Sequence, residues 1–248
     1  MSDLATFAKS VDDAQCAATA IERLSIKHAE LSVEDAYEIQ RLSIARRVTR
    51  GERRVGVKIS QADADGISWG CLTDAMILEE GATLEKSNYL QPQLKPGIVF
   101  LLNKPLSGRV TALQAMSAIE AIAPAINVVD SRYKESKSSF VDFIADNASI
   151  SGLVIGTRHS PEVDFSNLGM VLSVNGRPVQ IGSSAAIFGN PVRSLVAAAK
   201  MVAQTGETLQ PGDIVMAGGA AAAHPASVDE TITLDVQNLG SISISIDA

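Results

Sequence analysis

From Val55 to the C-terminus, the chain is a succession of short apolar runs separated by turn residues, and this pattern limits the fold more than any other feature. The runs are rich in Val and Ile and shorter than most helices, so they predict strands. The body of the protein is therefore expected to be β-rich. The predicted strands cover residues 55–60, 97–102, 152–157, 170–179, 213–218, 229–236 and 240–246.

A hairpin and a half-buried strand are the clearest elements in this part of the chain. Asn175 and Gly176 stand between two Val-containing arms, and this pair suits the positive φ angles of a type I′ turn. Residues 241–246 alternate Ser and Ile with a period of two, as expected for a strand with one buried face. Both features support the β-rich interpretation.

The N-terminal part of the chain has a different pattern, which predicts helices. Residues 3–30 place small and apolar side chains on one face. Ser32 opens a second helix three residues before Asp35, a variant of the capping box, and Gly51 ends it. Two further helices are expected at about residues 111–123 and 191–205.

No internal repeat, low-complexity linker or charge block divides the chain, so a single domain is expected. This domain covers residues 1–248, with an N-terminal helical region over 1–54 and a β-rich catalytic body over 55–248. The length is within the range of single β-rich domains, and a chain with 46% hydrophobic residues can bury a large core.

The formal net charge of −7 argues against a general nucleic-acid surface, which needs a basic face, but leaves room for a small basic pocket. The N-terminal segment lacks the apolar run of a signal peptide, and no run of about 18 apolar residues predicts a membrane span. Cys16 and Cys71 have no metal-binding spacing, so free thiols in a reduced compartment are expected. We expect a cytoplasmic protein that binds neither nucleic acid nor membranes.

Lys58 is the first residue that could carry chemistry. Apolar residues alternate around it in VGVKIS (55–60), so its side chain could project from a strand into the interior. A buried lysine is costly unless it is paired or used. The alternative is a lysine whose ammonium group reaches the surface, and this segment alone leaves both open.

Three loop-like segments could line a pocket or could simply order turns. Residues 140–149 concentrate polar side chains among apolar ones, a pattern that usually orders a loop by hydrogen bonds to the backbone. Residues 181–192 lead into a helix, whose N-terminus can bind an anion. Residues 216–225 contain glycines that permit close approach of the backbone. For each segment the structural interpretation is favoured over the functional one.

Eight short segments match, in order and at about the same spacing, those of one enzyme family. They are LSVEDAYEIQ (31–40), VGVKIS (55–60), WGCLTDAM (69–76), YLQPQL (89–94), APAINVVDSR (123–132), FVDFIADNAS (140–149), FGNPV (188–192) and PGDIVMAGG (211–219). Together they resemble the 2-oxopent-4-enoate hydratase / 4-oxalocrotonate decarboxylase family of the fumarylacetoacetate hydrolase superfamily. One such segment would mean little, whereas eight in order indicate a shared fold.

The resemblance implies an α/β (α+β) fold, a fumarylacetoacetate-hydrolase-like roll of mixed β-sheets with outer helices. Family members act in the breakdown of aromatic compounds, on conjugated 2-oxo acids that a divalent metal, usually Mg²⁺, holds in place. A lysine and an aspartate help to move protons, which implies catalytic roles for Lys58 and Asp74. The same resemblance places Ser149 near the substrate, a small anionic or carbonyl compound, and we expect Asn127 and Arg132 to bind the substrate as well.

The chain departs from the family at the positions of the three metal-binding glutamates, which hold Lys95, Gly97 and Asn127. Mg²⁺ prefers hard, mostly anionic oxygen ligands. We therefore expect no cofactor, and a metal-independent lyase or isomerase in which Lys95 replaces the metal as electrophile. Lys95 could instead form a Schiff base if burial lowers its pKa. Our hypothesis is that Lys95, Lys58 and Asp74 converge on one pocket.

A second interpretation is a noncatalytic homologue that binds a small molecule or serves as the partner subunit of a related enzyme. The retention of Lys58 and Asp74 at family positions favours the enzyme. Family members are commonly oligomeric, so the resemblance also implies a homo-oligomer, or a complex with a related family enzyme.

Overall fold

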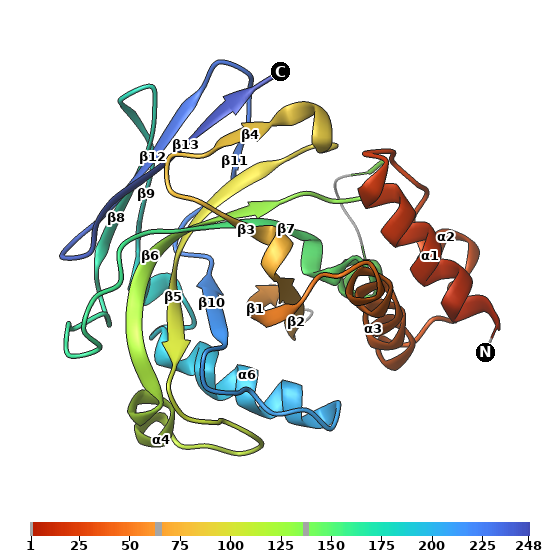
Figure 1. Ribbon diagram of the computed structural model, residues 1–248, viewed down its shortest axis with the longest axis horizontal. Helices are drawn as coiled ribbons and strands as arrows, with labels where there is room; N and C mark the ends of the chain where they lie inside the picture. Colours follow the sequence, from red (N-terminus) through yellow and green to blue (C-terminus); the bar gives the residue numbers. More distant parts are fainter. Residues whose placement is uncertain (1, 63–65, 136–138) are drawn as a thin grey trace.

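A computed structural model describes residues 2–62, 66–135 and 139–248 (Figure 1). Its described strands form an eight-stranded sheet and a five-stranded sheet. The order in the larger sheet is β2-β1-β10-β5-β6-β7-β3, and β11 pairs with β5. The strands of this sheet are β1 (Arg54–Ala62), β2 (Gly66–Thr73), β3 (Ile77–Leu78), β5 (Gln93–Leu102), β6 (Ile119–Val129), β7 (Ile150–Ile155), β10 (Ile214–Gly218) and β11 (His224–Pro225).

The larger sheet is mixed, as expected. Strand β1 runs parallel to β10 and antiparallel to β2, whereas β10 and β6 both run antiparallel to β5. Strand β10 therefore lies between β1 and β5, far from both in sequence. This pairing joins the early β1–β2 hairpin to the centre of the sheet.

The smaller sheet has the order β4-β13-β12-β8-β9 and contains the predicted hairpin. Asn175 and Gly176 connect β8 to β9 with φ angles of 49° and 77°, which confirms the predicted turn. In β13, Ile242, Ile244 and Ile246 are buried, so the Ser–Ile alternation was interpreted correctly. The strands are β4 (Thr83–Glu85), β8 (Gly169–Val174), β9 (Arg177–Ser183), β12 (Thr231–Val236) and β13 (Gly240–Asp247).

Helices α1, α2 and α3 gather at one end of the molecule, and α6 lies below the larger sheet in the view of Figure 1. The helices are α1 (Ser2–Cys16), α2 (Leu24–Lys27), α3 (Val33–Thr49), α4 (Ala112–Ser117), α5 (Phe140–Ala145) and α6 (Val192–Gln204). The short 3₁₀ helices are η1 (Asp74–Met76), η2 (Lys86–Asn88), η3 (Asn147–Ser149) and η4 (Ser184–Ala186). No helix in the described ranges is long and apolar enough to cross a bilayer.

The predicted helices were right in part. The Ser32–Asp35 capping box is present at the start of α3, and α6 matches its predicted range. The helix predicted over 3–30 is wrong, because α1 ends at Cys16 and Ala18 has a φ of 45°. The helix predicted over 111–123 ends at Ser117, because the apolar residues that follow pair with β5 as strand β6.

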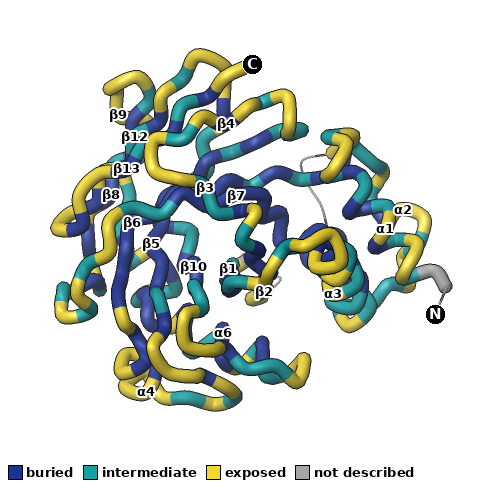
Figure 2. Tube along the Cα trace, in the orientation of Figure 1, coloured by how far each residue is buried: buried dark blue, intermediate teal, exposed yellow. Residues whose placement is uncertain are grey.

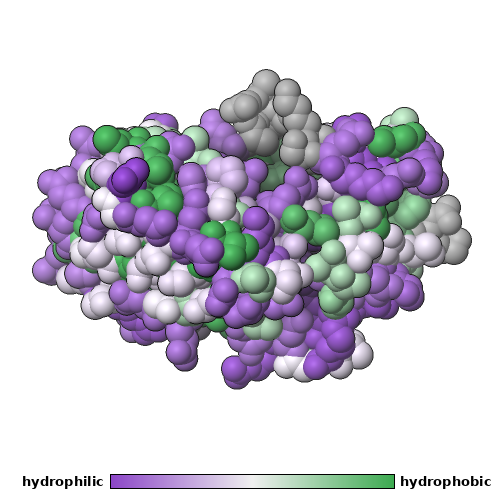
Figure 3. All heavy atoms as spheres, turned by 90° about the horizontal axis from the view of Figure 1, so that it is seen from above, coloured by the Kyte–Doolittle hydropathy of each residue, from purple (hydrophilic) through white to green (hydrophobic). Residues whose placement is uncertain are grey.

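Figure 2 shows buried residues along β5, β6 and β10, where the main core lies between the sheets. A second cluster joins the N-terminal helices to α5 and includes Val11, Ile39, Tyr133 and Ile144. In Figure 3 the visible face is mostly hydrophilic, with separate small hydrophobic patches. The second cluster fixes α5 against the N-terminal helices, and α5 in turn forms part of the candidate site.

Candidate active site

A cavity of about 650 Å³ opens between the larger sheet, α5 and two loops. Alternate residues of two neighbouring strands form its floor: Gln93 and Lys95 of β5, and Asn127 and Val129 of β6. The intervening Leu94 and other alternate residues point into the core instead. The complete lining is Lys58, Ser60, Gln61, Gln91, Gln93, Lys95, Asn127, Val129, Asp130, Ser131, Ser139, Phe140, Phe143, Ser149, Ala186, Phe188, Gly218, Gly219 and Ala223.

Lys58 reaches this cavity from the middle of β1 and is only 4% exposed. Its Nζ atom donates a hydrogen bond of 2.8 Å to the carbonyl oxygen of Ala148 and lies 5.8 Å from the centre of the Phe143 ring. The structure therefore supports the buried interpretation of this lysine and excludes the exposed one.

The surroundings of Lys58 disfavour its charged form. Burial lowers the pKa of Lys58 to about 7, and the positive charges of Lys95 and Arg132 act in the same direction, while Asp146 opposes them. A pKa near neutrality means that the amine can gain or lose a proton at the working pH of most cytoplasmic enzymes.

Lys95 and Asn127 are directly opposite each other in the register of β5 and β6, and both line the cavity. Asn127 is fully buried, and neither its Nδ2 nor its Oδ1 atom has a hydrogen-bond partner among the described residues. A buried amide without partners is costly. Because this amide faces a cavity beside an ammonium group, a polar or anionic ligand would satisfy it.

Ser149 also lines the cavity, at the end of an unusual stretch of backbone. Asn147, Ala148 and Ser149 all have positive φ angles, of 52°, 51° and 53°. The Asn147 side chain holds this stretch by accepting from the Cys71 N–H at 2.7 Å and donating to its carbonyl oxygen at 2.9 Å. The strained stretch thereby presents the Ala148 carbonyl to Lys58 and the Ser149 side chain to the cavity.

Arg132 does not reach the cavity, contrary to the predicted role in substrate binding. It is 1% exposed, and its guanidinium group forms a buried ion pair with Asp146. It also donates to the Asp130 carbonyl at 2.7 Å and to the Ser151 hydroxyl at 2.6 Å. These bonds use the guanidinium to fix the loops beneath the cavity floor.

Asp74 lies outside the site, so the predicted convergence of Lys95, Lys58 and Asp74 is wrong for Asp74. Its side chain is 32% exposed and pairs with Arg53 at 2.9 Å. Hydrogen bonds from the backbone and side chain of Arg53 lower the pKa of Asp74. Asp74 follows β2 at the end away from Lys58, because Lys58 is opposite Gly70 in the register of β1 and β2. The structure brings together Lys58, Lys95, Asn127 and Ser149.

Sequence reasoning missed several residues of the cavity. Each of the three loop-like segments contributes to the wall. Phe143 comes from the segment of the predicted Ser149, and the other two segments contribute Ala186, Phe188, Gly218 and Gly219. The signal was present in the clustering of small and polar residues, but turns without function share it. Gln91 and Gln93 lie in the family segment 89–94, but nothing in that segment assigned their side chains to a cavity.

The donor atoms that the described residues bring to the cavity do not form an ordinary site for a divalent metal. Among the lining residues the carboxylate is that of Asp130, which accepts the N–H groups of Leu90 and Gln91 at 3.0 and 2.7 Å. Within the described ranges, no group of three His, Cys, Asp or Glu residues could hold a metal ion. Divalent cations such as Mg²⁺ prefer several anionic oxygen ligands.

Comparison with known proteins defines the class. Residues 76–246 match the family model "Fumarylacetoacetate (FAA) hydrolase C-terminal". A 4-oxalocrotonate decarboxylase of Pseudomonas sp is 45% identical, over 98% of this chain and 97% of that protein. A 2-hydroxyhexa-2,4-dienoate hydratase of Comamonas testosteroni is 32% identical, over 89% of each chain. The chain therefore belongs to the fumarylacetoacetate hydrolase superfamily and is an enzyme of its hydratase/decarboxylase group.

Solved structures agree and correct one prediction. The 4-oxalocrotonate decarboxylase from Pseudomonas putida G7, complexed with magnesium and adipate, matches with a TM-score of 0.95 and 28% identity, over 99% of this chain and 97% of that one. Another structure of that enzyme holds calcium and acetate. The expectation that no cofactor is used is contradicted by these metal complexes. The described donor atoms of this cavity do not fit such an ion.

Proposed function

We propose that this protein is a lyase that decarboxylates a small conjugated 2-oxo acid carrying a second carboxylate, in the cavity that contains Lys58 and Lys95. The observation that carries the proposal is that one cavity of an acidic protein contains two lysines and a buried amide with no hydrogen-bond partner among the described residues. The 45% identity to a 4-oxalocrotonate decarboxylase supports the same reaction class.

In this proposal Lys95 and Asn127 bind the carboxylate next to the 2-oxo group. The Lys95 ammonium supplies charge, and the Asn127 Nδ2 atom supplies a hydrogen bond that it otherwise lacks. Because the two residues are opposite each other on adjacent strands, one carboxylate can contact both. The 2-oxo group then extends from the floor of the cavity toward Lys58.

The phenylalanines of the cavity suit the end of the substrate that loses carbon dioxide. Phe140, Phe143 and Phe188 form an apolar part of the wall. A carboxylate in less polar surroundings is poorly solvated. Its negative charge leaves this position when the group departs as neutral carbon dioxide, so apolar surroundings favour the decarboxylation. Lys58, whose pKa is about 7, is suited to the proton transfers that the reaction requires near neutral pH.

The test is an ultraviolet assay with freshly prepared 4-oxalocrotonate and 2-hydroxypentadienoate, with magnesium chloride in one set of samples and EDTA in the other. We expect loss of the conjugated absorbance of 4-oxalocrotonate with release of carbon dioxide. Lys58→Met and Lys95→Met should each lower kcat/KM by roughly 100-fold or more, a typical value for groups that transfer protons or stabilise charge.

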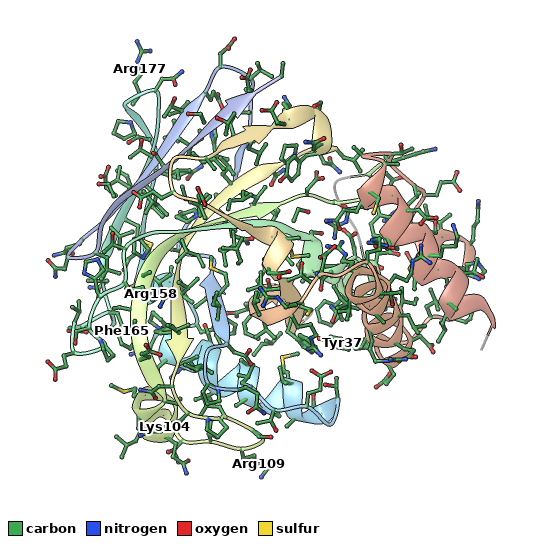
Figure 4. The ribbon with its side chains drawn as sticks, viewed as in Figure 1. Tyr37, Lys104, Arg109, Arg158, Phe165 and Arg177 are labelled. Carbon is green, nitrogen blue, oxygen red and sulfur yellow. The ribbon has the colours of Figure 1, made fainter. Side chains whose placement is uncertain are left out.

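The control is Lys104→Met, because Lys104 is exposed and projects near α4, at the lower edge of the molecule in Figure 4. This variant should retain full turnover. Turnover of 2-hydroxypentadienoate without release of carbon dioxide would show that the enzyme is a hydratase and not a decarboxylase. Failure to turn over either compound with or without magnesium would refute the proposed reaction.

We also propose that the protein forms a homo-oligomer. Strand β9 is an edge strand, and its Ile181 and Val179 side chains are 78% and 40% exposed. Exposed apolar residues on an edge strand favour association. Light scattering should give a mass above that of the monomer, and Ile181→Ser should lower it; a monomeric wild-type protein would refute this proposal.

A further inference from the structure

Lys58 has a setting that suits covalent chemistry as well as proton transfer. Its amine opens onto the cavity, yet its side chain is 4% exposed and the Phe143 ring lies 5.8 Å away. One N–H is directed to the Ala148 carbonyl oxygen at 2.8 Å. A neutral amine held by one hydrogen bond keeps its lone pair for attack on a carbonyl carbon.

We propose that Lys58 forms a Schiff base with the 2-oxo carbon of the substrate. The inference rests on the proposed substrate class, but it can be tested without turnover. It assigns the covalent bond to Lys58, whereas sequence reasoning considered Lys95 for that role. Lys95 is instead the neighbouring cation and the partner of the substrate carboxylate.

The charged groups around Lys58 support this assignment. Lys95 comes from β5, Arg132 from the loop after β6, and Asp146 from the end of α5. Burial, Lys95 and Arg132 lower the pKa of Lys58, whereas Asp146 raises it less, because its carboxylate is paired with Arg132. Lysines desolvated in a pocket or placed beside another cation are those that enzymes use as nucleophiles.

The position of the hydrogen-bond acceptor is also fixed. The Ala148 carbonyl belongs to the backbone stretch with positive φ angles, which Asn147 ties to Cys71. Such strain persists only where the surrounding structure enforces it, and it is concentrated at functional sites. The carbonyl therefore holds the amine toward the cavity while Asn127 and Lys95 hold the carboxylate of the acid.

The proposed steps balance in atoms and electrons. The neutral Lys58 amine attacks the 2-oxo carbon, and the resulting carbinolamine takes up a proton and loses water to give an iminium ion. The bond to the departing carboxylate then breaks, and its electron pair moves through the conjugated double bond to the iminium nitrogen, releasing carbon dioxide. A proton adds to carbon, water hydrolyses the renewed iminium ion, and a proton is released with the free amine. No oxidant or reductant is required.

The experiment traps the imine with pyruvate, a 2-oxo acid that lacks the second carboxylate released in the proposed reaction. Wild-type protein is incubated with pyruvate and sodium borohydride, and the product is analysed by intact mass and peptide mapping. We expect one adduct, on Lys58, with the mass of the acid minus water plus two hydrogens. Lys58→Arg should lose the adduct, and Lys104→Arg, at an exposed position, should retain it.

A pH series tests the role of the neighbouring charge. Trapping should become faster as the pH rises through about 7, because only the neutral Lys58 amine attacks. Lys95→Met removes a positive charge and should raise the pKa of Lys58, which shifts the trapping profile to higher pH. A lysine with only a structural role would give no adduct and no such shift.

Absence of an adduct with both pyruvate and 4-oxalocrotonate would overturn the proposal, as would an adduct located on Lys95 or spread over surface lysines. Peptide mapping of the wild-type protein identifies the site even if Lys58→Arg does not fold. The two proposals fail separately. An adduct on Lys58 without turnover of the conjugated acids would refute only the reaction, and turnover without an adduct would refute only the Schiff base.

Discussion

Lys58 combines a buried position with a pKa of about 7, and this combination has a cost in stability. The ordinary pKa of lysine is near 10.5, so the unfolded chain binds more protons than the folded protein between these two values. The free energy of unfolding therefore rises with pH across this window. A site that destabilises its own fold in this way is typical of residues kept for function.

Replacing Lys58 should make the protein more stable. Lys58→Met removes the free-energy cost of deprotonating the lysine on folding. The lost hydrogen bond to Ala148 offsets part of this gain. We therefore expect the free energy of unfolding to increase by about 2 kcal/mol at pH 7. The gain should shrink as the pH approaches 10. Urea denaturation at several pH values measures it, with Lys104→Met as the control. A loss of stability at pH 7 would contradict the assignment of a lowered pKa.

Asn127 provides a second test at the scale of single residues. Its amide has no partner among the described residues, so removing it should not weaken the fold, whereas substrate should lose a hydrogen bond to a charged group. We expect Asn127→Ala to raise KM about tenfold or more. Initial-rate measurements with 4-oxalocrotonate check this value, with the free energy of unfolding as the control. An unchanged KM would show that the amide does not contact the substrate.

The sequence revealed more of the strands than of the site. The strands around Lys58 and at 241–246 follow directly from apolar patterning, which the sheets preserve. The break after Cys16 could not be predicted, because Ala18 adopts a positive φ without a glycine to mark it. Helix-forming alanines in 119–123 became strand because pairing with β5 outweighs local preference. The division of the domain after residue 54 stays a prediction.

The site was less predictable because its residues converge only through tertiary pairing. Lys58 and Lys95 meet because β10 places β1 and β5 in one sheet, and no local pattern encodes that order. Asp74 was assigned from resemblance alone, and its ion pair with Arg53 on the surface could not be anticipated from the segment. The loop segments were ambiguous because pocket walls and ordinary turns use the same small and polar residues.

At the scale of elements, Gly97 of β5 is packed tightly against β10. A Cβ atom there would lie 2.6 Å from the Ala217 carbonyl oxygen and 2.7 Å from the Met216 Cε atom. The backbone oxygen cannot move without disturbing the sheet. Gly97, assigned from the sequence to a lost metal-ligand position, is thus required by packing.

We therefore expect Gly97→Ala to destabilise the protein by about 2 kcal/mol, the usual cost of overpacking a buried position. Gly218→Ala is the matched control, because Gly218 is opposite Gly97 in the register and its nearest contact is the flexible Met216 side chain at 3.4 Å. Thermal unfolding of both variants measures the difference. Equal stability of the two would show that β5 and β10 can separate without cost.

At the scale of the whole molecule, Asp12 joins the first helix to the third. It is fully buried and pairs with Arg46 and Arg50 at 2.7 Å and with Arg47 at 3.7 Å. Burial raises the pKa of Asp12, but the hydrogen bonds and charges of these arginines outweigh it and hold the pKa below its usual value. The stability that this pairing gives is present near neutral pH and is lost as the pH falls through the lowered pKa.

We expect Asp12→Asn to lower the free energy of unfolding by about 2 kcal/mol at pH 7, because bonds to a charged group are lost. Its neighbour Asp13 is 47% exposed and also contacts Arg46, so Asp13→Asn should lower the free energy of unfolding less than Asp12→Asn does, because water screens an exposed ion pair. Urea denaturation at pH 7 and at acid pH checks both expectations. The difference in free energy of unfolding between Asp12→Asn and wild type should become smaller at acid pH. A constant difference would show that the charge of Asp12 does not cause the loss of stability.

The place of β10 between β1 and β5 has a consequence for the order of events during synthesis. Lys58 lies in β1 and leaves the ribosome well before β10, the strand that brings it beside Lys95. Contacts between distant segments form late in folding. Until then Lys58 is an ordinary solvated ammonium group that does not react with the 2-oxo acids of the cell. The nascent chain therefore acquires the proposed nucleophile only after β10 has been made.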